Sequence, residues 1–174
     1  VCTSSGHSAQ ILALFPLMSP GDNIIASTRL YGGTIQQFTN TIEKFGWTAK
    51  FVDIDDIDKL KKSVDEKTKA IFCESISNPG GHITNLIEVG RLSKSFKIPL
   101  IVDNTAASPF LCNPINFGEE TEQNFPTVWF EIVASLSLPP ACIIVVSCEA
   151  RKDPSPTSAH LVSSVNPILL LIML

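Results

Sequence analysis

The chain has 174 residues, with 13 lysines and arginines against 17 aspartates and glutamates, so its net charge is −4. This balance argues against a nucleic-acid-binding domain, which usually has a basic excess. Hydrophobic residues make up 44% of the chain and charged residues 17%, which argues against disorder over most of its length.

Charge and glycine are unevenly distributed along the chain. Residues 1–118 hold 11 basic and 11 acidic side chains, whereas residues 119–174 hold two and six. All nine glycines lie at or before Gly118. We therefore predict one domain over residues 1–118 and an unmatched tail over residues 119–174, with a frameshift or disorder as the two explanations of the tail. The chain opens at Val1 rather than at a methionine, so we expect a fragment.

The first part of the predicted domain alternates helices with strands. Apolar residues recur at helical spacing over residues 8–18, and Pro20-Gly21-Asp22 predicts a turn after them. We then expect a buried strand over residues 23–26 and a helix over residues 31–45 that Gly46 closes. A second strand is predicted over residues 48–52.

The same alternation continues to the end of the domain. The acidic run over residues 53–58 suits a helix N-terminus, and a third strand is expected over residues 68–72. A loop over residues 77–81 and a fourth strand over residues 98–102 flank another helix. We expect that helix to be capped by Thr84 or Asn85 and to turn four apolar residues inward: Leu86, Val89, Leu92 and Phe96. The pattern predicts an α/β fold with a mainly parallel sheet covered on both faces.

Polar residues follow the predicted strands at the point where each strand ends. They are Tyr31 after the first strand, Glu74 and Asn78 after the third, and Asp103, Asn104 and Thr105 after the fourth. Ser4-Ser5-Gly6 precedes the first helix, whose free N–H groups suit a phosphate. Ligands of open α/β sheets bind beyond the carboxyl ends of the strands, so these residues are expected to converge. A purely structural role is the alternative for each of these residues: Ser5-Gly6 would only cap the helix, and Asp103 would only cap a loop.

The cysteines and the apolar runs indicate the cellular compartment of the protein and whether it has a metal site or a membrane segment. Five cysteines form no CxxC pair, and the three histidines make no metal spacing with them, so we expect free thiols in a reducing, cytoplasmic setting and no metal site. No signal peptide opens the chain. The apolar run over residues 168–174 is too short to cross a bilayer, and Glu131 and Pro139-Pro140 interrupt the run over residues 128–148, so no membrane segment is expected.

Four motifs occur together over residues 1–118. They are Ser4-Ser5-Gly6-His7-Ser8-Ala9 with Gln10, Leu30-Tyr31-Gly32-Gly33-Thr34 with Phe38, Lys69-Ala70-Ile71-Phe72 leading to Glu74-Ser-Ile-Ser-Asn78-Pro79, and Pro99-Leu-Ile-Val-Asp103-Asn104-Thr105 with Ser108-Pro109. In this order and spacing the set resembles the Cys/Met-metabolism family of pyridoxal-phosphate enzymes. Within that family it looks most like the O-acetylhomoserine sulfhydrylases, with cystathionine lyases and methionine lyase as near alternatives.

The resemblance implies a fold, a cofactor and a reaction. The fold is part of the large domain of a fold-type-I transferase that uses pyridoxal 5′-phosphate. The family reaction replaces the γ-substituent of O-acetylhomoserine, a small amino acid, with sulfide or methanethiol and forms homocysteine or methionine. Family members are oligomers with shared active sites, so a homo-oligomer is expected.

The resemblance also implies roles for individual residues. Gly6 and His7 would offer backbone N–H groups to the cofactor phosphate, and Asn78 would bond its phenolic oxygen. Tyr31 would stack on the pyridine ring and assist proton transfer, and Asp103 would pair with the ring nitrogen. Thr105 would support the ring or Asp103. Glu74 has a weaker claim, as a wall of the site or a substrate-side residue.

The family's Schiff-base lysine is missing from its expected place. Counting forward from Asp103 puts its Ser-x-Thr-Lys motif near Thr127, where this chain has Asn124-Phe-Pro-Thr-Val-Trp129. No lysine occurs between Lys97 and Lys152, so we expect weak cofactor binding at best and no turnover. We favour a frameshift, a retained intron or a misassembled read as the explanation of the tail. A genuine but divergent C-terminus is the alternative explanation. Lys152, in a predicted solvated loop, is a less favoured replacement.

Two further hypotheses come from other classes of protein. The chain is alternatively a non-catalytic remnant that associates with intact subunits of the family. A nucleotide-binding Rossmann domain is disfavoured, because no GxGxxG follows the first predicted strand.

Overall fold

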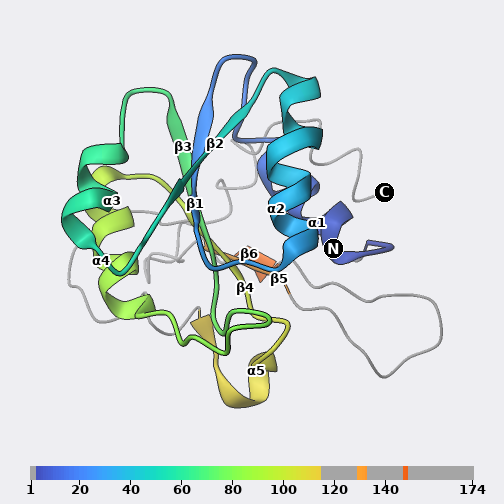
Figure 1. Cartoon of the computed structure of the whole chain (residues 1–174), viewed down its shortest axis with the longest axis vertical. Helices are drawn as coiled ribbons and strands as arrows, with labels where there is room; N and C mark the ends of the chain where they lie inside the picture. The colour runs from blue at the N-terminus through green and yellow to red at the C-terminus, as the bar shows by residue number, and fades with distance from the viewer. Residues whose placement is uncertain (1–2, 115–128, 133–146, 149–174) are drawn as a thin grey trace, which may run out of the picture.

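The computed structural model describes residues 3–114, 129–132 and 147–148. These residues form one six-stranded sheet in the order β2-β1-β3-β4-β5-β6 (Figure 1). The strands are β1 (Asn23–Ser27), β2 (Thr48–Val52), β3 (Thr68–Glu74), β4 (Leu100–Asp103), β5 (Trp129–Ile132) and β6 (Ser147–Cys148). Strands β1 to β5 are parallel, and β6 pairs with β5 in the antiparallel sense.

Helices connect the parallel strands. They are α1 (Gly6–Leu14), α2 (Gly32–Gln36), η1 (Gln37–Thr41), η2 (Ile42–Phe45), α3 (Ile57–Ser63), α4 (Leu86–Phe96) and α5 (Ser108–Leu111). The single helix predicted over residues 31–45 is thus an α-helical turn that continues through a π-helical segment, η1, into a 3₁₀ turn, η2. Gly46 ends it in the left-handed conformation at φ 75°, as predicted.

Local capping chemistry explains where the other helices start. The side chain of Ser5 accepts a hydrogen bond from the Ser8 amide at the start of α1. The side chain of Asp56 accepts one from the Lys59 amide at the start of α3. Of the two candidates for the start of α4, Asn85 is the cap, because its side chain accepts from the Glu88 amide. Thr84 instead donates its hydroxyl to the carbonyl of Glu74 at 2.7 Å.

The sheet is covered by helices on both faces, as the apolar strands predicted. Alternate side chains of each strand point to opposite faces. Ile24, Phe72 and Ile101 join the core under α1 and α2, whereas Ile25 and Ile71 join the core under α3 and α4. Figure 1 shows α3 and α4 on one side of the sheet and α1 and α2 on the other. Each fully buried side chain of this size stabilises the fold by about 1.5–3 kcal/mol.

The prediction that Phe96 points inward is wrong. Its side chain is 37% exposed, although Leu86, Val89 and Leu92 of the same helix are buried. Phe96 is the last residue of α4, and the chain turns away at Lys97, whose φ is 58°. Helical periodicity therefore places Phe96 on the apolar face, but the helix ends before a second layer covers it.

Cys73 lies on the strand that occupies the centre of the sheet, and it should be chemically inert in the folded chain. Its thiol is fully buried, and burial raises its pKa well above the ordinary range. Because the thiolate is the reactive form, we expect iodoacetamide to modify Cys73 only after unfolding. Peptide mass spectrometry of native and denatured samples measures this, with the half-buried Cys112 as the comparison. Native labelling of Cys73 at the rate of Cys112 would contradict the structure.

No helix in the described part of the chain is both long enough and apolar enough to cross a membrane.

Candidate functional site

The predicted polar residues gather at the carboxyl ends of β1, β3 and β4. These three strands are neighbours, and the chain moves from β1 to β2 on one side and to β3 on the other, which makes β1/β3 a switch point. Glu74 and Asp103 end β3 and β4 and are paired in register. Side chains two residues apart in a strand point to the same face of the sheet. Glu74 is two residues after Phe72 and Asp103 is two residues after Ile101, so both carboxylates lie on the face that α1 and α2 cover.

The N-terminus of α1 supplies backbone donors at the same face. Gly6 and His7 are its first two residues, and amides at these positions have no acceptor within the helix. The carbonyl of His7 accepts a hydrogen bond of 3.0 Å from the side-chain amide of Gln37. Gln37 is the first residue of the π-helical segment η1, so this irregular turn ties the start of α1 to the helix that follows Tyr31.

Tyr31, His7 and Gly33 are in close contact. The ring centroids of His7 and Tyr31 are 6.4 Å apart, and the Tyr31 side chain is 49% exposed. A Cβ atom on Gly33 would lie 2.6 Å from Cε1 of Tyr31 and 2.8 Å from Nε2 of His7. Glycine at this position therefore leaves the space that both rings use. In the sequence Gly33 stands out only as part of the Leu30-Tyr31-Gly32-Gly33-Thr34 motif, and the Gly32-Gly33 pair is the signal that could have indicated its role.

Glu74 joins the two loops that follow β1 and β3. Its Oε1 accepts a hydrogen bond from the amide of Tyr31 at 2.7 Å, and its Oε2 accepts one from the amide of Asn78 at 3.1 Å. The Glu74 residue is 5% exposed. Burial raises its pKa from the ordinary value of 4.5, the two amide hydrogen bonds oppose that rise, and the nearby carboxylate of Asp103 adds to it.

The raised pKa of Glu74 predicts a pH dependence of stability. A carboxyl group whose folded pKa lies above its unfolded value adds stability that is fully present below the unfolded pKa and is lost as pH rises through the folded pKa. Urea unfolding of the wild type and of Glu74→Gln from pH 4 to pH 8 measures the effect. We expect the unfolding free energy of the wild type, taken relative to the variant, to fall with rising pH. A difference that stays flat or rises over this range would contradict the prediction.

Asp103 is held by Thr105, one of the two roles expected for that residue, and by Gln10, a contact that the sequence did not predict. Its Oδ1 accepts from the amide of Thr105 at 3.1 Å, and its Oδ2 lies 3.5 Å from Nε2 of Gln10. Gln10 is buried in α1 and also donates to the hydroxyl of Thr34 at 3.0 Å. Its own Oε1 has no hydrogen-bond partner among the residues that the structure describes. A buried unpaired oxygen is costly, and here it lies on a side chain that contacts Asp103, the carboxylate predicted to bind the cofactor.

A charged cluster ties three loops together at the same edge of the sheet. Arg29, after β1, pairs with Asp55 and, at 3.2 Å, with Asp53, both after β2. His82, after β3, lies 2.9 Å from the Arg29 guanidinium and 2.8 Å from Asp55. These side chains are about one third exposed, so solvent screening keeps their contribution to stability modest.

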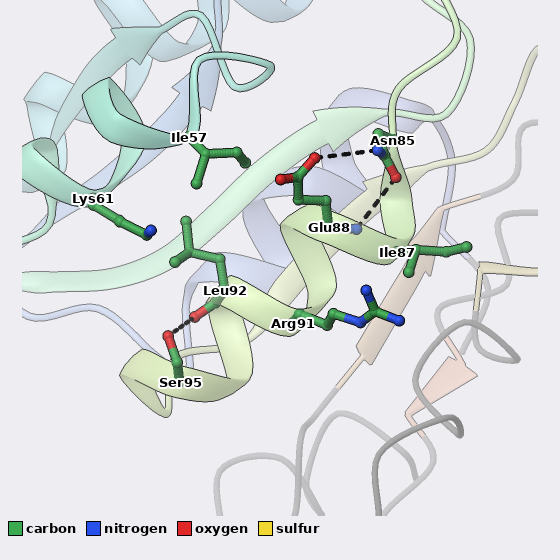
Figure 2. A pocket seen from close by; sticks show the side chains of 8 residues that line it. All are labelled: Ile57, Lys61, Asn85, Ile87, Glu88, Arg91, Leu92 and Ser95. Carbon is green, nitrogen blue, oxygen red and sulfur yellow. Dashed lines mark hydrogen bonds between the residues drawn. The ribbon is translucent and has the colours of Figure 1, made fainter.

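A groove on the surface lies apart from these residues. Its volume is about 670 Å³, and it is lined by side chains of α3 and α4 together with the cap residue Asn85. Figure 2 shows its lining residues, among them Lys61 and Arg91. The groove contains no residue predicted to bind the cofactor.

The structure thus brings most of the predicted site residues into one region. Tyr31 and Asn78 are linked through Glu74, Asp103 lies on the next strand, and Gly6 and His7 begin the helix beside Tyr31. The Asn78 residue is exposed, and its side chain's role stays a prediction. The place expected for the Schiff-base lysine, near Thr127, and the alternative Lys152 lie outside the described residues.

This fold and site define a class of protein. They combine a parallel sheet covered on both faces with an aromatic ring, two carboxylates and a helix N-terminus at the carboxyl ends of its strands, where ligands of open α/β sheets bind. A family model described as "Cys/Met metabolism PLP-dependent enzyme" matches residues 1–121. The chain therefore belongs to this family of pyridoxal-phosphate-dependent enzymes.

Individual relatives agree with the family match. The chain is 40% identical over 130 residues to the homocysteine/cysteine synthase of Kluyveromyces lactis, covering 74% of this chain and 29% of that protein. It is 37% identical over 120 residues to the O-acetyl-L-homoserine sulfhydrylase of Leptospira meyeri, covering 69% of this chain and 27% of that protein. The chain thus spans about three tenths of the length of these curated relatives.

Solved structures show the same fold. A putative O-acetylhomoserine (thiol)-lyase from Campylobacter jejuni, which contains N′-pyridoxyl-lysine-5′-monophosphate, aligns with a TM-score of 0.67 and 40% identity. The alignment covers 75% of this chain and 31% of that one. Cystathionine γ-lyase from Lactobacillus plantarum aligns with a TM-score of 0.65 and 31% identity over 75% of this chain and 32% of that one. The fold-type-I prediction is confirmed.

Proposed function

We propose that the protein to which these residues belong replaces the γ-acetoxy group of O-acetylhomoserine with sulfide or methanethiol. The products are homocysteine or methionine, together with acetate. The observation that supports this proposal best is the arrangement of Tyr31, Asp103 and the N-terminus of α1 around one edge of the sheet. The names of the relatives, homocysteine synthases and O-acetylhomoserine sulfhydrylases, support the choice of substrate.

The described residues fit pyridoxal 5′-phosphate in chemistry. Gly6 and His7 present helix N-terminal amides for a phosphate, and Gly33 keeps the ring of Tyr31 free of a clash. Asp103 is a carboxylate for a protonated ring nitrogen, and Thr105 holds one of its oxygens. The unpaired Oε1 of Gln10 marks a buried acceptor next to Asp103.

We assign the following roles on this basis. The cofactor, when bound, withdraws electrons from the substrate carbon that loses its proton. Asp103 keeps the ring nitrogen protonated, and Gln10 and Thr105 keep Asp103 oriented. Tyr31 stacks on the ring and accepts or returns a proton at its phenolic oxygen. Asn78 bonds the phenolic oxygen of the cofactor, and Glu74 lies behind Tyr31 and Asn78 rather than on the substrate side.

We further propose that the chain with this sequence does not turn over. The family anchors its cofactor on a lysine that this chain lacks between Lys97 and Lys152. The transcript across codons 110–135 tests whether the tail is an artefact. A neighbouring frame that encodes Ser-x-Thr-Lys would predict an active protein once that frame is restored.

The activity test compares the 174-residue chain with the frame-restored protein. Each is loaded with pyridoxal 5′-phosphate and given O-acetylhomoserine with sulfide, and homocysteine is measured by mass spectrometry. We expect homocysteine from the restored protein and none above a blank from the given chain. Turnover by the given chain would refute its proposed inactivity. A restored protein that binds cofactor but releases no homocysteine would refute the sulfhydrylase proposal.

The γ-lyase alternative is supported by the likeness to cystathionine γ-lyase. The same preparations, given cystathionine or methionine without sulfide, would then release ammonia and a 2-oxo acid. We expect the sulfhydrylase reaction to be faster, because the first relatives are synthases and sulfhydrylases.

Assembly and location follow from the same proposal. We propose that the protein acts in the cytoplasm as a homo-oligomer, or, if the given chain is genuine, as a non-catalytic partner of intact subunits. The buried free thiol of Cys73 suits a reducing compartment. Co-purification of a tagged 174-residue chain with a full-length homologue tests the second assembly, and a chain recovered alone would contradict it.

A further inference from the structure

We propose that Glu74 is a positioning residue that holds Tyr31 and Asn78 at a fixed separation through their backbone amides. The inference rests on the proposed function, because Tyr31 and Asn78 are two of its expected cofactor contacts. Within the described part of the chain, neither residue makes a hydrogen bond through its side chain. Both are held through main-chain N–H groups, by the two oxygens of one carboxylate, at 2.7 Å and 3.1 Å.

The geometry requires a carboxylate of this length. Two donors from separate loops converge on Glu74, and an ionised carboxylate accepts at both oxygens without donating. A glutamine would present an N–H₂ group to one of the two amides, so one hydrogen bond would become a repulsive contact. An alanine would leave both amides without this partner.

Glu74 is itself firmly anchored in the sheet. It is the last residue of β3, its carbonyl accepts the Thr84 hydroxyl at 2.7 Å, and it pairs in register with Asp103 of β4. The amide of Ser75 donates to the carbonyl of Asp103 at 3.0 Å and continues that pairing. The carboxylate thus extends from the central strand, and its position is coupled to that of the second carboxylate of the site.

Tyr31 depends on this contact more than an ordinary helix start does. It is the cap residue of α2, and its side chain makes no capping hydrogen bond. In a capping box, a glutamate three residues into the helix bonds the amide of the cap residue. Here Glu74 supplies the equivalent bond from another strand. Because the Tyr31 ring is half exposed, its backbone is the part that the fold can hold.

Amide hydrogen exchange of the 174-residue chain tests these two hydrogen bonds of Glu74 without any cofactor. We compare the wild type, Glu74→Gln and Glu74→Ala with the surface control Glu43→Gln. In Glu74→Ala the amides of Tyr31 and Asn78 should both exchange about tenfold faster, because both lose their acceptor. In Glu74→Gln the amide that faces the new N–H₂ group should do so, and in the control both amides should exchange at the wild-type rate. Unchanged exchange at both amides would overturn the proposal.

Binding of pyridoxamine 5′-phosphate tests the consequence for the site. This probe retains the phosphate, ring nitrogen and phenolic oxygen and needs no lysine, and its fluorescence reports binding. We expect Kd to rise about three- to tenfold in Glu74→Gln, with the circular dichroism of the bound probe reduced and Glu43→Gln unchanged. Faster exchange with an unchanged Kd would overturn the positioning role. Failure of the wild type to bind would contradict the proposed function instead, and amide exchange would then decide about Glu74 alone.

Discussion

Replacing Phe72 by alanine is expected to lower the free energy of unfolding by about 3–5 kcal/mol. Phe72 is fully buried on β3, the strand between β1 and β4. Its ring meets that of Phe38 edge to face, with centroids 4.8 Å apart and planes at 84°. The substitution removes both the transfer free energy of the ring and this contact, and it leaves a cavity beneath α2 and η1.

Urea unfolding followed by circular dichroism measures the effect, with Phe110→Ala as the control. The Phe110 residue is 93% exposed, so the same substitution there should change the unfolding free energy by no more than about 0.5 kcal/mol. Small domains have only about 5–15 kcal/mol of stability, so Phe72→Ala is expected to be unfolded in part at 37 °C. Equal effects of the two substitutions would contradict the core described for this face of the sheet.

Replacing Gly33 by alanine is expected to weaken the binding of pyridoxamine 5′-phosphate about tenfold with little loss of stability. The new Cβ would lie 2.6 Å from the Tyr31 ring and 2.8 Å from the His7 ring, so at least one ring must move. Both side chains are exposed and can turn aside at little cost to the fold. Alanine also favours the helix by about 1 kcal/mol over glycine. The expected change therefore falls on the site and not on the fold.

Gly32→Ala is the matched control, because a Cβ at Gly32 meets nothing within 4 Å in the same helical turn. Fluorescence titration with pyridoxamine 5′-phosphate and thermal unfolding are measured on both variants. We expect Gly32→Ala to bind as the wild type does and both variants to unfold at or above the wild-type temperature. Equal binding by the two variants would show that the contact between Gly33 and the two rings is not needed.

Much of the fold could be predicted from local sequence. The strands predicted over residues 23–26 and 68–72 correspond to β1 and β3, whose side chains are almost all buried, as expected for parallel strands covered on both faces. The strand predicted over residues 48–52 is β2, which lies at the edge of the sheet and is mostly exposed or half-buried. Gly46 ended its helix as expected, because only the left-handed conformation closes the turn there. Phe96 was misplaced because periodicity describes a helix face but not what covers it.

The candidate site could be predicted in part. Tyr31, Asn78 and Asp103 follow strands, and the rule for open α/β sheets indicates that they converge. Gln10 and Gly33 were missed as site residues for different reasons. The contact of Gln10 with Asp103 joins segments that are distant in the chain. The role of Gly33 depends on the space left by its missing Cβ, which only the folded structure shows. Glu74 was predicted only as a wall of the site or a substrate-side residue, and the hydrogen bonds from both its oxygens to backbone amides could not be read from the sequence.

The sequence by itself determined the element order, the parallel sheet and the resemblance to a pyridoxal-phosphate family, because these depend on residue type and spacing along the chain. It also determined that the chain has no lysine where that family has its cofactor anchor. Only the tertiary structure decided that Glu74 is a tether between Tyr31 and Asn78 and that Gly33 makes room for two rings. Both features depend on contacts between segments that are distant in the chain, Tyr31 with Glu74 and His7 with Gly33, and on the direction of a side chain. Strand register and helix packing set these distances.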